Sequence, residues 1–190
     1  MEKGNQLFPV FLKLNQLNLL IVGGGNVGLE KATAILNNSP EVNLTLVAPY
    51  FLPELEEFIQ NFSNVRLIKR KFQVEDLENK QLVICATDQP ELHKEIKQIC
   101  SQRYLLSNVA DTPDLCDFYL GSIVKKGDLK IGISTNGKSP TLAKRLKAFL
   151  NDIIPDQIQE SLDNLESYRK KIKGDFEEKI RKLNEITKDL

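Results

Sequence analysis

The chain has 190 residues, a length that fits one domain or one domain with an appendage. Lysine and arginine together number 26, aspartate and glutamate also number 26, and the formal net charge is zero. This balance removes the global basic excess expected of a nucleic-acid-binding protein, although a local basic patch can hide within it. The apolar runs are too short to span a bilayer, and the N-terminal residues do not form a secretory signal. We therefore expect no nucleic-acid partner and no membrane partner.

The three cysteines, Cys85, Cys100 and Cys116, are widely spaced and odd in number. They form no C-x-x-C pair, so the sequence indicates neither a zinc site nor a disulfide framework. We therefore predict ordinary thiols in a reducing compartment, a cytoplasmic location and no metal-ligating residues.

Short apolar segments alternate with segments of helical spacing over the first part of the chain. Strands are predicted at residues 17–22, 42–48, 65–69, 81–86 and 104–109, and helices at 27–36, 53–62 and 90–102. Strands that alternate with helices in this way are typical of an α/β fold. The sequence therefore predicts a Rossmann-type, doubly wound parallel sheet with helices on both faces.

The pattern changes after Asp111. Residues 118–124 and 129–134 are predicted to form two strands joined by a short turn, which favours an antiparallel hairpin. A helix is predicted from Ser139 to about Leu150. These elements predict a small α+β region after the domain that contains the parallel sheet.

Beyond residue 150, apolar residues recur at helical spacing among charged residues, with a predicted break near Gly174. This pattern indicates one or two amphipathic helices. We therefore predict three regions: a Rossmann domain at 1–112, a small α+β region at 113–150 and a helical region at 151–190.

A glycine-rich motif of the form G-x-G-x-x-G lies between the first predicted strand and the first predicted helix. Gly23 permits a tight turn, Gly25 lets the backbone approach a pyrophosphate, and Gly28 allows close packing of helix and strand. Free N–H groups and the helix dipole then attract the anion. A turn without a ligand is the alternative, but three correctly placed glycines exceed what packing requires. The predicted nucleotide contacts of this turn are Gly23, Gly25, Asn26, Val27 and Gly28.

The acidic residue that binds the adenosine ribose in many such folds is absent. The second predicted strand ends in Ala48-Pro49-Tyr50-Phe51, and no lysine or arginine stands there to hold a 2′-phosphate. We therefore predict NAD rather than NADP as the cofactor. The ribose contacts would come from backbone groups around Pro49 and Tyr50.

Several segments together resemble one family in their order and spacing. They are 7–14 (LFPVFLKL), 22–28 (VGGGNVG), 47–49 (VAP), 86–88 (ATD), 108–118 (NVADTPDLCDF) and 133–145 (ISTNGKSPTLAKR). This combination is similar to the precorrin-2 dehydrogenase/sirohydrochlorin ferrochelatase family, the N-terminal part of siroheme synthase. The resemblance covers essentially the whole chain.

The resemblance implies NAD-dependent oxidation of precorrin-2 to sirohydrochlorin in siroheme biosynthesis, with a tetrapyrrole as substrate. Some family members also insert ferrous iron, and the resemblance leaves open whether this chain has that ferrochelatase activity. It further implies a homodimer in which the region 113–150 provides the dimerisation surface. Because the chain ends at Leu190, we expect no fused methyltransferase domain.

Asp111 matches the aspartate that the family uses in catalysis, and it follows a predicted strand. Its local alternative is a turn with Thr112-Pro113, which the resemblance makes the weaker reading. Asn108 would contact the nicotinamide or position Asp111, or it is merely a polar residue at a strand end. Thr87 and Asp88 are predicted to line the cofactor cleft, and Asp88 could equally cap the next helix.

The segment from Ser134 to Pro140 joins a predicted strand to a predicted helix. Hydroxyl groups beside a helix start suit carboxylates, of which precorrin-2 has many. Thr135 stands where some family members carry serine, so the hydroxyl is kept. Each lysine here could instead be merely solvated. The predicted substrate contacts are Ser134, Thr135, Lys138, Ser139, Lys144 and Arg145.

A non-catalytic, NAD-sensing regulatory module on the same fold is the alternative function, because a fold alone does not fix an activity. The segments around Asp111 and Lys138 count against it, since a sensor needs neither a placed aspartate nor an anion-binding region. His93, the only histidine, is predicted to be a surface or packing residue rather than a base.

Overall fold

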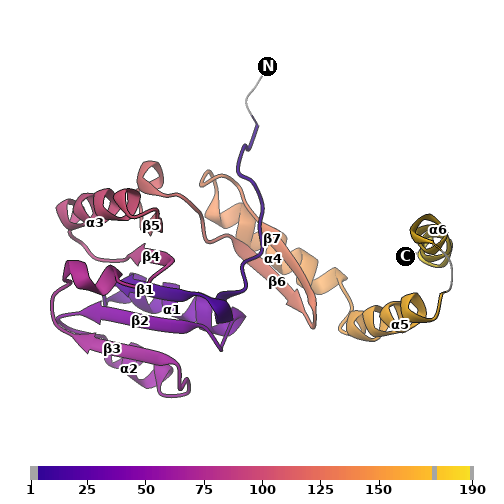
Figure 1. The fold of residues 1–190 in the computed structure, drawn as a ribbon, viewed down its shortest axis with the longest axis horizontal. Coiled ribbons are helices and arrows are strands. Elements are labelled where there is room, and N and C mark those ends of the chain that lie inside the picture. Colours follow the sequence, from indigo (N-terminus) through magenta and orange to yellow (C-terminus); the bar gives the residue numbers. More distant parts are fainter. Residues whose placement is uncertain (1–3, 173–174, 189–190) are drawn as a thin grey trace. The chain divides into compact units, whose positions relative to one another are not determined.

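The computed structural model of the chain describes residues 4–172 and 175–188 (Figure 1). The chain divides into two compact units, one formed by Val10–Leu120 and the other by the residues on either side of that segment. The division into three functional regions at residues 112 and 150 remains a prediction.

A five-stranded parallel sheet in the order β3-β2-β1-β4-β5 forms the centre of the unit Val10–Leu120. Its strands are β1 (Asn18–Val22), β2 (Asn43–Ala48), β3 (Val65–Lys69), β4 (Leu82–Cys85) and β5 (Leu106–Val109), and its helices are α1 (Asn26–Asn38), α2 (Pro53–Ile59) and α3 (Pro90–Gln102). Three short 3₁₀ turns lie at Leu14–Gln16, Val74–Leu77 and Pro113–Leu115. The strand order reverses between β1 and β4, as in doubly wound folds, so the Rossmann-type prediction is confirmed.

The apolar strands are buried on both faces because helices cover both sides of the sheet. Alternate residues of β1 point to opposite faces. Leu19 and Ile21 pack in a core with residues of α1 and α2, whereas Leu20 and Val22 pack in a second core with Ile96 of α3. A continuous apolar run such as LNLLIV is the expected sequence for a strand in this position.

Among its described residues, the second unit contains an antiparallel hairpin and three helices. The hairpin pairs β6 (Ser122–Lys126) with β7 (Leu129–Ile133), and the helices are α4 (Pro140–Ile153), α5 (Ile158–Lys171) and α6 (Phe176–Ile186). Gly127 closes the hairpin with a φ of 58°. The predicted break near Gly174 lies outside the described residues. No helix within the described part of the chain has the length and apolar character needed to cross a membrane.

Two predicted strand starts are wrong, and both have a tertiary cause. The strand predicted at 118–124 begins only at Ser122, because Phe118 packs against the core of the Rossmann unit and its carbonyl accepts a hydrogen bond from Asn108. The strand predicted at 104–109 begins at Leu106, because Tyr104 has a left-handed backbone that ends α3.

Candidate functional site

The glycine-rich turn joins β1 to α1, and two of its glycines are required by the backbone itself. Gly23 has a φ of 131°, and a Cβ added there would lie 2.2 Å from the carbonyl oxygen of Ala86. A Cβ added at Gly28 would lie 2.5 Å from the carbonyl oxygen of Gly23. Strand, turn and helix can therefore approach this closely only with glycine at both positions.

Gly25 differs from its neighbours because a Cβ added there would meet nothing within 4 Å. Gly25 precedes α1, no side chain caps that helix, and its first turn carries no acidic residue. The first backbone bond of the helix runs from the N–H of Leu29 to the carbonyl of Gly25, at 2.9 Å. The N–H groups at this helix start thus face open space at the positive end of the dipole, an arrangement that fits the pyrophosphate of NAD.

Gly24 has a role that the sequence analysis missed. A Cβ added there would lie 2.2 Å from the carbonyl oxygen of Tyr50 and 2.7 Å from the ring of Phe51. The N–H of Leu52 also donates to the carbonyl of Gly24, at 2.9 Å. The loop after β2, with Pro49 and the exposed Tyr50, is therefore held directly against the glycine-rich turn. The only sequence signal was a third consecutive glycine inside the motif.

Thr87 follows β4 and contacts the single histidine. Its N–H donates to Nε2 of His93 at 3.3 Å, and its Oγ1 lies 2.8 Å from the same nitrogen. Burial lowers the pKa of His93, so the imidazole is neutral at neutral pH and packs as predicted. Asp88 is exposed and does not cap α3, whose N-cap residue is Gln89 and whose start has no side-chain cap. The N–H of Gln89 donates to Oγ1 of Thr87.

Asn108, in β5, is buried and holds the chain segment that follows. Its Nδ2 donates to the carbonyl of Phe118 at 2.8 Å and lies 3.4 Å from Sγ of Cys116. The amide N–H groups are therefore used within the fold. Of the two functional roles predicted for Asn108, the arrangement favours positioning of the segment that carries Asp111.

Asp111 lies just beyond β5 and is exposed, with a left-handed backbone φ of 57°. Within the described residues, no group hydrogen-bonds its carboxylate. The N–H of Ala110 donates to the carbonyl of Cys85 and extends the β4–β5 pairing up to this point. Because β1, β4 and β5 are adjacent and parallel, Gly23, Thr87 and Asp111 follow strand ends at the same edge of the sheet. Ligands of doubly wound folds bind at this edge.

The predicted substrate contacts lie in the second unit, around the connection from β7 to α4. Oγ of Ser139 accepts from the N–H of Leu142 and caps α4, while Oγ1 of Thr135 accepts from the N–H of Ser139. Oγ of Ser134 accepts from the N–H of Asn136. These three hydroxyls therefore shape their own loop.

The basic side chains of this region are placed differently. Lys138, Lys144 and Arg145 are exposed, and no carboxylate of the described residues lies within ion-pair distance of them. Three cations close together in sequence, with no internal anion, are available to an anionic ligand.

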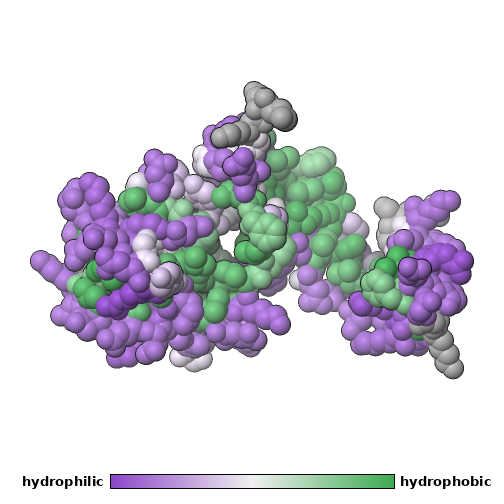
Figure 2. All heavy atoms as spheres, turned by 45° about the horizontal axis from the view of Figure 1, so that its top comes forward, coloured by the Kyte–Doolittle hydropathy of each residue, from purple (hydrophilic) through white to green (hydrophobic). Residues whose placement is uncertain are grey.

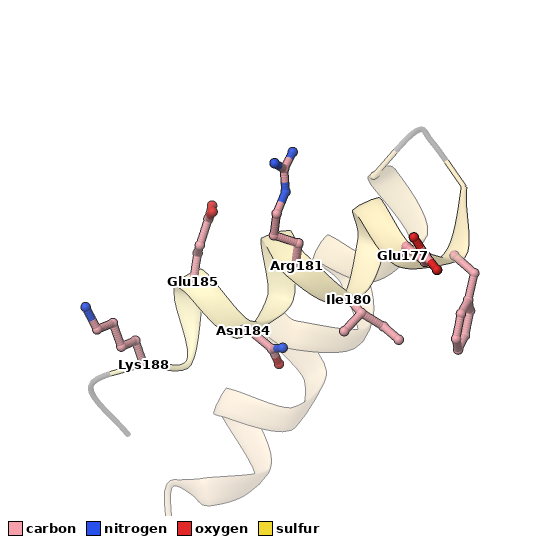
Figure 3. Close-up of a pocket in the computed structure, with 7 residues that line it drawn as sticks. Glu177, Ile180, Arg181, Asn184, Glu185 and Lys188 are labelled. Atoms are coloured by element: carbon pink, nitrogen blue, oxygen red, sulfur yellow. The ribbon is translucent and has the colours of Figure 1, made fainter.

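The described residues contain no group of three or more His, Cys, Asp or Glu side chains that could hold a metal ion. Ferrous iron insertion, which the resemblance leaves open, is not decided by this result. An open hollow of about 630 Å³ lies along α6, and residues such as Ile180, Arg181 and Asn184 line it (Figure 3). None of the predicted site residues contributes to this hollow.

Two family models match the chain. Residues 10–122 match the family described as "Putative NAD(P)-binding", and residues 126–152 match "Sirohaem biosynthesis protein central". Siroheme synthase of Thioalkalivibrio sulfidiphilus is 32% identical over 88% of this chain and 34% of its own length. Siroheme synthase of Pseudoalteromonas translucida is 35% identical over 90% of this chain and 36% of its own length. The chain thus spans about a third of the length of these curated relatives.

Among solved structures, the chain is similar to SirC, precorrin-2 dehydrogenase. The TM-score is 0.74, the sequence identity is 25%, and the match covers 96% of this chain and 90% of the other. This similarity therefore extends over nearly the full length of both proteins.

Proposed function

Because the chain belongs to the NAD(P)-binding family found in the N-terminal part of siroheme synthase, we propose that it is an NAD-dependent precorrin-2 dehydrogenase. It oxidises precorrin-2 to sirohydrochlorin in siroheme biosynthesis. The observation that carries this proposal is the presence, at one sheet edge, of an open nucleotide-binding turn and an exposed, unpartnered carboxylate at Asp111. The full-length similarity to SirC supports the same activity.

The turn between β1 and α1 holds the cofactor. The N–H groups of Asn26 and Val27 bind the pyrophosphate at the start of α1. Backbone groups around Pro49 and Tyr50 hold the adenosine ribose, since the contact of that loop with Gly24 places it beside the turn. NAD, when bound, supplies the acceptor for the hydride that leaves precorrin-2.

Asp111 acts as the general base. The oxidation removes a hydride, which goes to the cofactor, and a proton, which the carboxylate of Asp111 accepts. The side chain is free for this role because no described residue uses its oxygens. Its location just beyond β5 puts it at the ligand-binding edge of the sheet.

The carboxylates of the substrate bind the exposed cations of the second unit, Lys138, Lys144 and Arg145. These cations have no described anionic partner, which supports this role. The hydrogen-bonded hydroxyls of Ser134, Thr135 and Ser139 keep the loop in shape at the start of α4.

The active form is a homodimer. The apolar side chains Leu142, Leu146, Phe149 and Ile153 recur along one face of α4, and each is between 39% and 58% exposed. Hydrophobic residues also gather visibly on the surface around the hairpin and α4 (Figure 2). A large exposed apolar face of this kind usually marks an interface between protein molecules.

The protein acts in the cytoplasm. All three cysteines are free thiols, as expected in a reducing compartment. Burial raises the pKa of Cys85 to about 12 and that of Cys100 to about 11, so these two thiols are unreactive packing residues.

The test replaces Asp111 with asparagine and measures NADH formation from precorrin-2 and NAD. We expect the turnover rate to fall by about 100-fold or more, because the base is lost. NAD affinity, measured by calorimetric titration, should change by less than about twofold, since the pyrophosphate site lies at the turn between β1 and α1 and not at β5. Asp114→Asn, an exposed aspartate in the same loop, is the matched control and should keep wild-type activity.

Two results would count against the proposal. Wild-type turnover in Asp111→Asn would remove Asp111 from the mechanism. A wild-type protein that forms no NADH from precorrin-2 would remove the dehydrogenase function itself.

A further inference from the structure

β5 is an edge strand of the parallel sheet, and two consecutive side chains cover its outer edge in place of a sixth strand. The N–H of Ser107 donates to Oδ2 of Asp117 at 2.9 Å, and the N–H of Val109 donates to Sγ of Cys116 at 3.2 Å. In return, the N–H of Asp117 donates to the carbonyl of Ser107 at 2.8 Å, and the thiol of Cys116 donates to the carbonyl of Val109 at 3.2 Å. Backbone groups that would otherwise be unpaired at a sheet edge are thus satisfied.

The carboxylate of Asp117 is the centre of this arrangement. Lys97 of α3 places its Nζ 2.6 Å from Oδ1, and the hydroxyl of Ser107 donates to Oδ2 at 2.8 Å. Ser107 is fully buried, while the Lys97 side chain is 19% exposed and that of Asp117 34% exposed. Burial by itself would raise the pKa of Asp117, but the hydrogen bonds from Lys97 and Ser107 outweigh it and keep the pKa below its ordinary value. Asp117 is therefore an anion at neutral pH.

These bonds fix both ends of one loop, residues 110–118, which we call the Asp111 loop. At its start, Ala110 pairs with β4, and at its end Asp117 and Phe118 are bonded to Ser107 and Asn108 of β5. Asp111 itself has a left-handed backbone, with a φ of 57°. Because no described residue holds the Asp111 carboxylate, its position depends on the backbone of this loop.

We propose that Asp117, held by Lys97 and Ser107, is a positioning residue that keeps the Asp111 loop in the geometry needed for proton transfer. This inference rests on the proposed function, in which Asp111 is the base. A general base works only within hydrogen-bond reach of its proton, and a displacement of about 1 Å can reduce the rate about 100-fold. The loop ends bonded to β5 therefore control the rate without contacting the substrate.

The first variant is Asp117→Asn, which keeps the shape of the side chain. Whichever way the amide faces, its NH₂ group cannot accept a hydrogen bond from Lys97 or from Ser107. We expect kcat for NADH formation to fall by about tenfold or more, with KM for precorrin-2 and the Kd for NAD within about twofold of wild type. NAD binding is spared because the glycine-rich turn follows β1, which β4 separates from β5.

Asp76→Asn is the matched control. Asp76 also pairs with a cation, Arg70, at 2.7 Å, and also accepts a backbone N–H, that of Gln73 at 2.9 Å. It lies in the same unit but follows β3, at the opposite edge of the sheet. The melting temperature of both variants is measured beside kcat. If, for an equal loss of melting temperature, Asp117→Asn lowers kcat no more than Asp76→Asn does, Asp117 has only a structural role and the proposal is wrong.

A double variant tests the coupling between the two charged residues. In Lys97→Met/Asp117→Asn, Oδ1 of the new amide can still accept from the N–H of Ser107, and no ammonium faces the NH₂ group. We therefore expect the kcat of the double variant, relative to wild type, to be about threefold or more above the product of the relative kcat values of the two single variants. Strictly multiplicative effects would overturn the proposed coupling.

Hydrogen exchange separates this inference from the proposed function. The N–H groups of Leu115, Cys116 and Asp117 are all hydrogen-bonded within the loop or to β5. In Asp117→Asn these amides should exchange about tenfold faster, while amides of α1 are unchanged. If they exchange at the wild-type rate, the positioning role fails, even where Asp111→Asn is inactive. If the wild-type protein does not oxidise precorrin-2 but exchange still depends on Asp117, the function fails and the loop-ordering role stands.

Discussion

Tyr104 shows how a single residue can lower the stability of this fold. It follows α3 with a φ of 57°, and its side chain is 95% exposed. The N–H of Leu105 donates to the carbonyl of Cys100, and the N–H of Tyr104 donates to that of Ser101, which is the helix ending that usually carries glycine. We expect Tyr104→Gly to raise the free energy of unfolding by about 0.5–1 kcal/mol, as measured by urea denaturation.

Arg103→Gly is the control for this prediction. Arg103 is one position earlier, with a φ of −96°, so glycine there relieves no strain and should not stabilise the protein. An unchanged or lower stability in Tyr104→Gly would show that the left-handed residue costs nothing here.

At the residue scale, the sequence predicted which groups stand at the sheet edge better than it predicted their hydrogen bonds. The location of Asp111 followed from its place after an apolar strand. The bond from Asn108 to the carbonyl of Phe118 could not be predicted, because those residues are ten positions apart and meet only when the chain returns along β5. The same applies to Asp117, whose partner Lys97 comes from α3.

At the scale of an element, two neighbouring glycines of the turn between β1 and α1 have different roles. Substitution of each one separates the packing of the turn from its binding of NAD. Alanine at Gly24 would place Cβ 2.2 Å from the backbone oxygen of Tyr50, so we expect Gly24→Ala to lower the free energy of unfolding by about 1–3 kcal/mol. Alanine at Gly25 would meet nothing, so Gly25→Ala should cost less than about 1 kcal/mol. Its methyl group would enter the space proposed for the pyrophosphate and weaken NAD binding by about tenfold or more.

Urea denaturation and calorimetric titration with NAD measure the two effects on both variants. Wild-type NAD affinity in Gly25→Ala would contradict the proposed pyrophosphate site. Wild-type stability in Gly24→Ala would contradict the close contact between the turn and the loop after β2.

The elements themselves were largely predictable because a parallel sheet imposes a simple pattern. A strand buried between helices is largely apolar, so a run such as LNLLIV was sufficient to predict β1. A helix packed on the sheet shows one apolar face, so its helical spacing was sufficient as well. Strand starts were less predictable, as Phe118 shows. Its apolar side chain fits a strand pattern, but its packing partner is the Rossmann core and not the hairpin.

At the scale of the whole molecule, the neutral net charge conceals a local imbalance. The chain has 26 basic and 26 acidic residues, and some of them pair along helices, as Lys170 pairs with Glu166. Lys138, Lys144 and Arg145 have no such described partner. A neutral protein can therefore offer a local cationic surface to an anionic substrate.

The apolar face of α4 leads to the last prediction, which concerns assembly. Leu142, Leu146, Phe149 and Ile153 lie four, three and four residues apart, so they share one helical face, and all are exposed. Burying this face against a second copy would remove it from water, at about 25 cal/mol per Å² of apolar surface. We expect the wild-type chain to sediment as a dimer, and Leu146→Glu/Phe149→Glu to sediment as a monomer because two buried carboxylates would lack partners. Lys147→Glu changes the charge of the same helix on a different face and should leave the dimer intact. Sedimentation velocity over a range of concentrations measures this directly, and a wild-type chain that stays monomeric throughout would rule out the proposed interface.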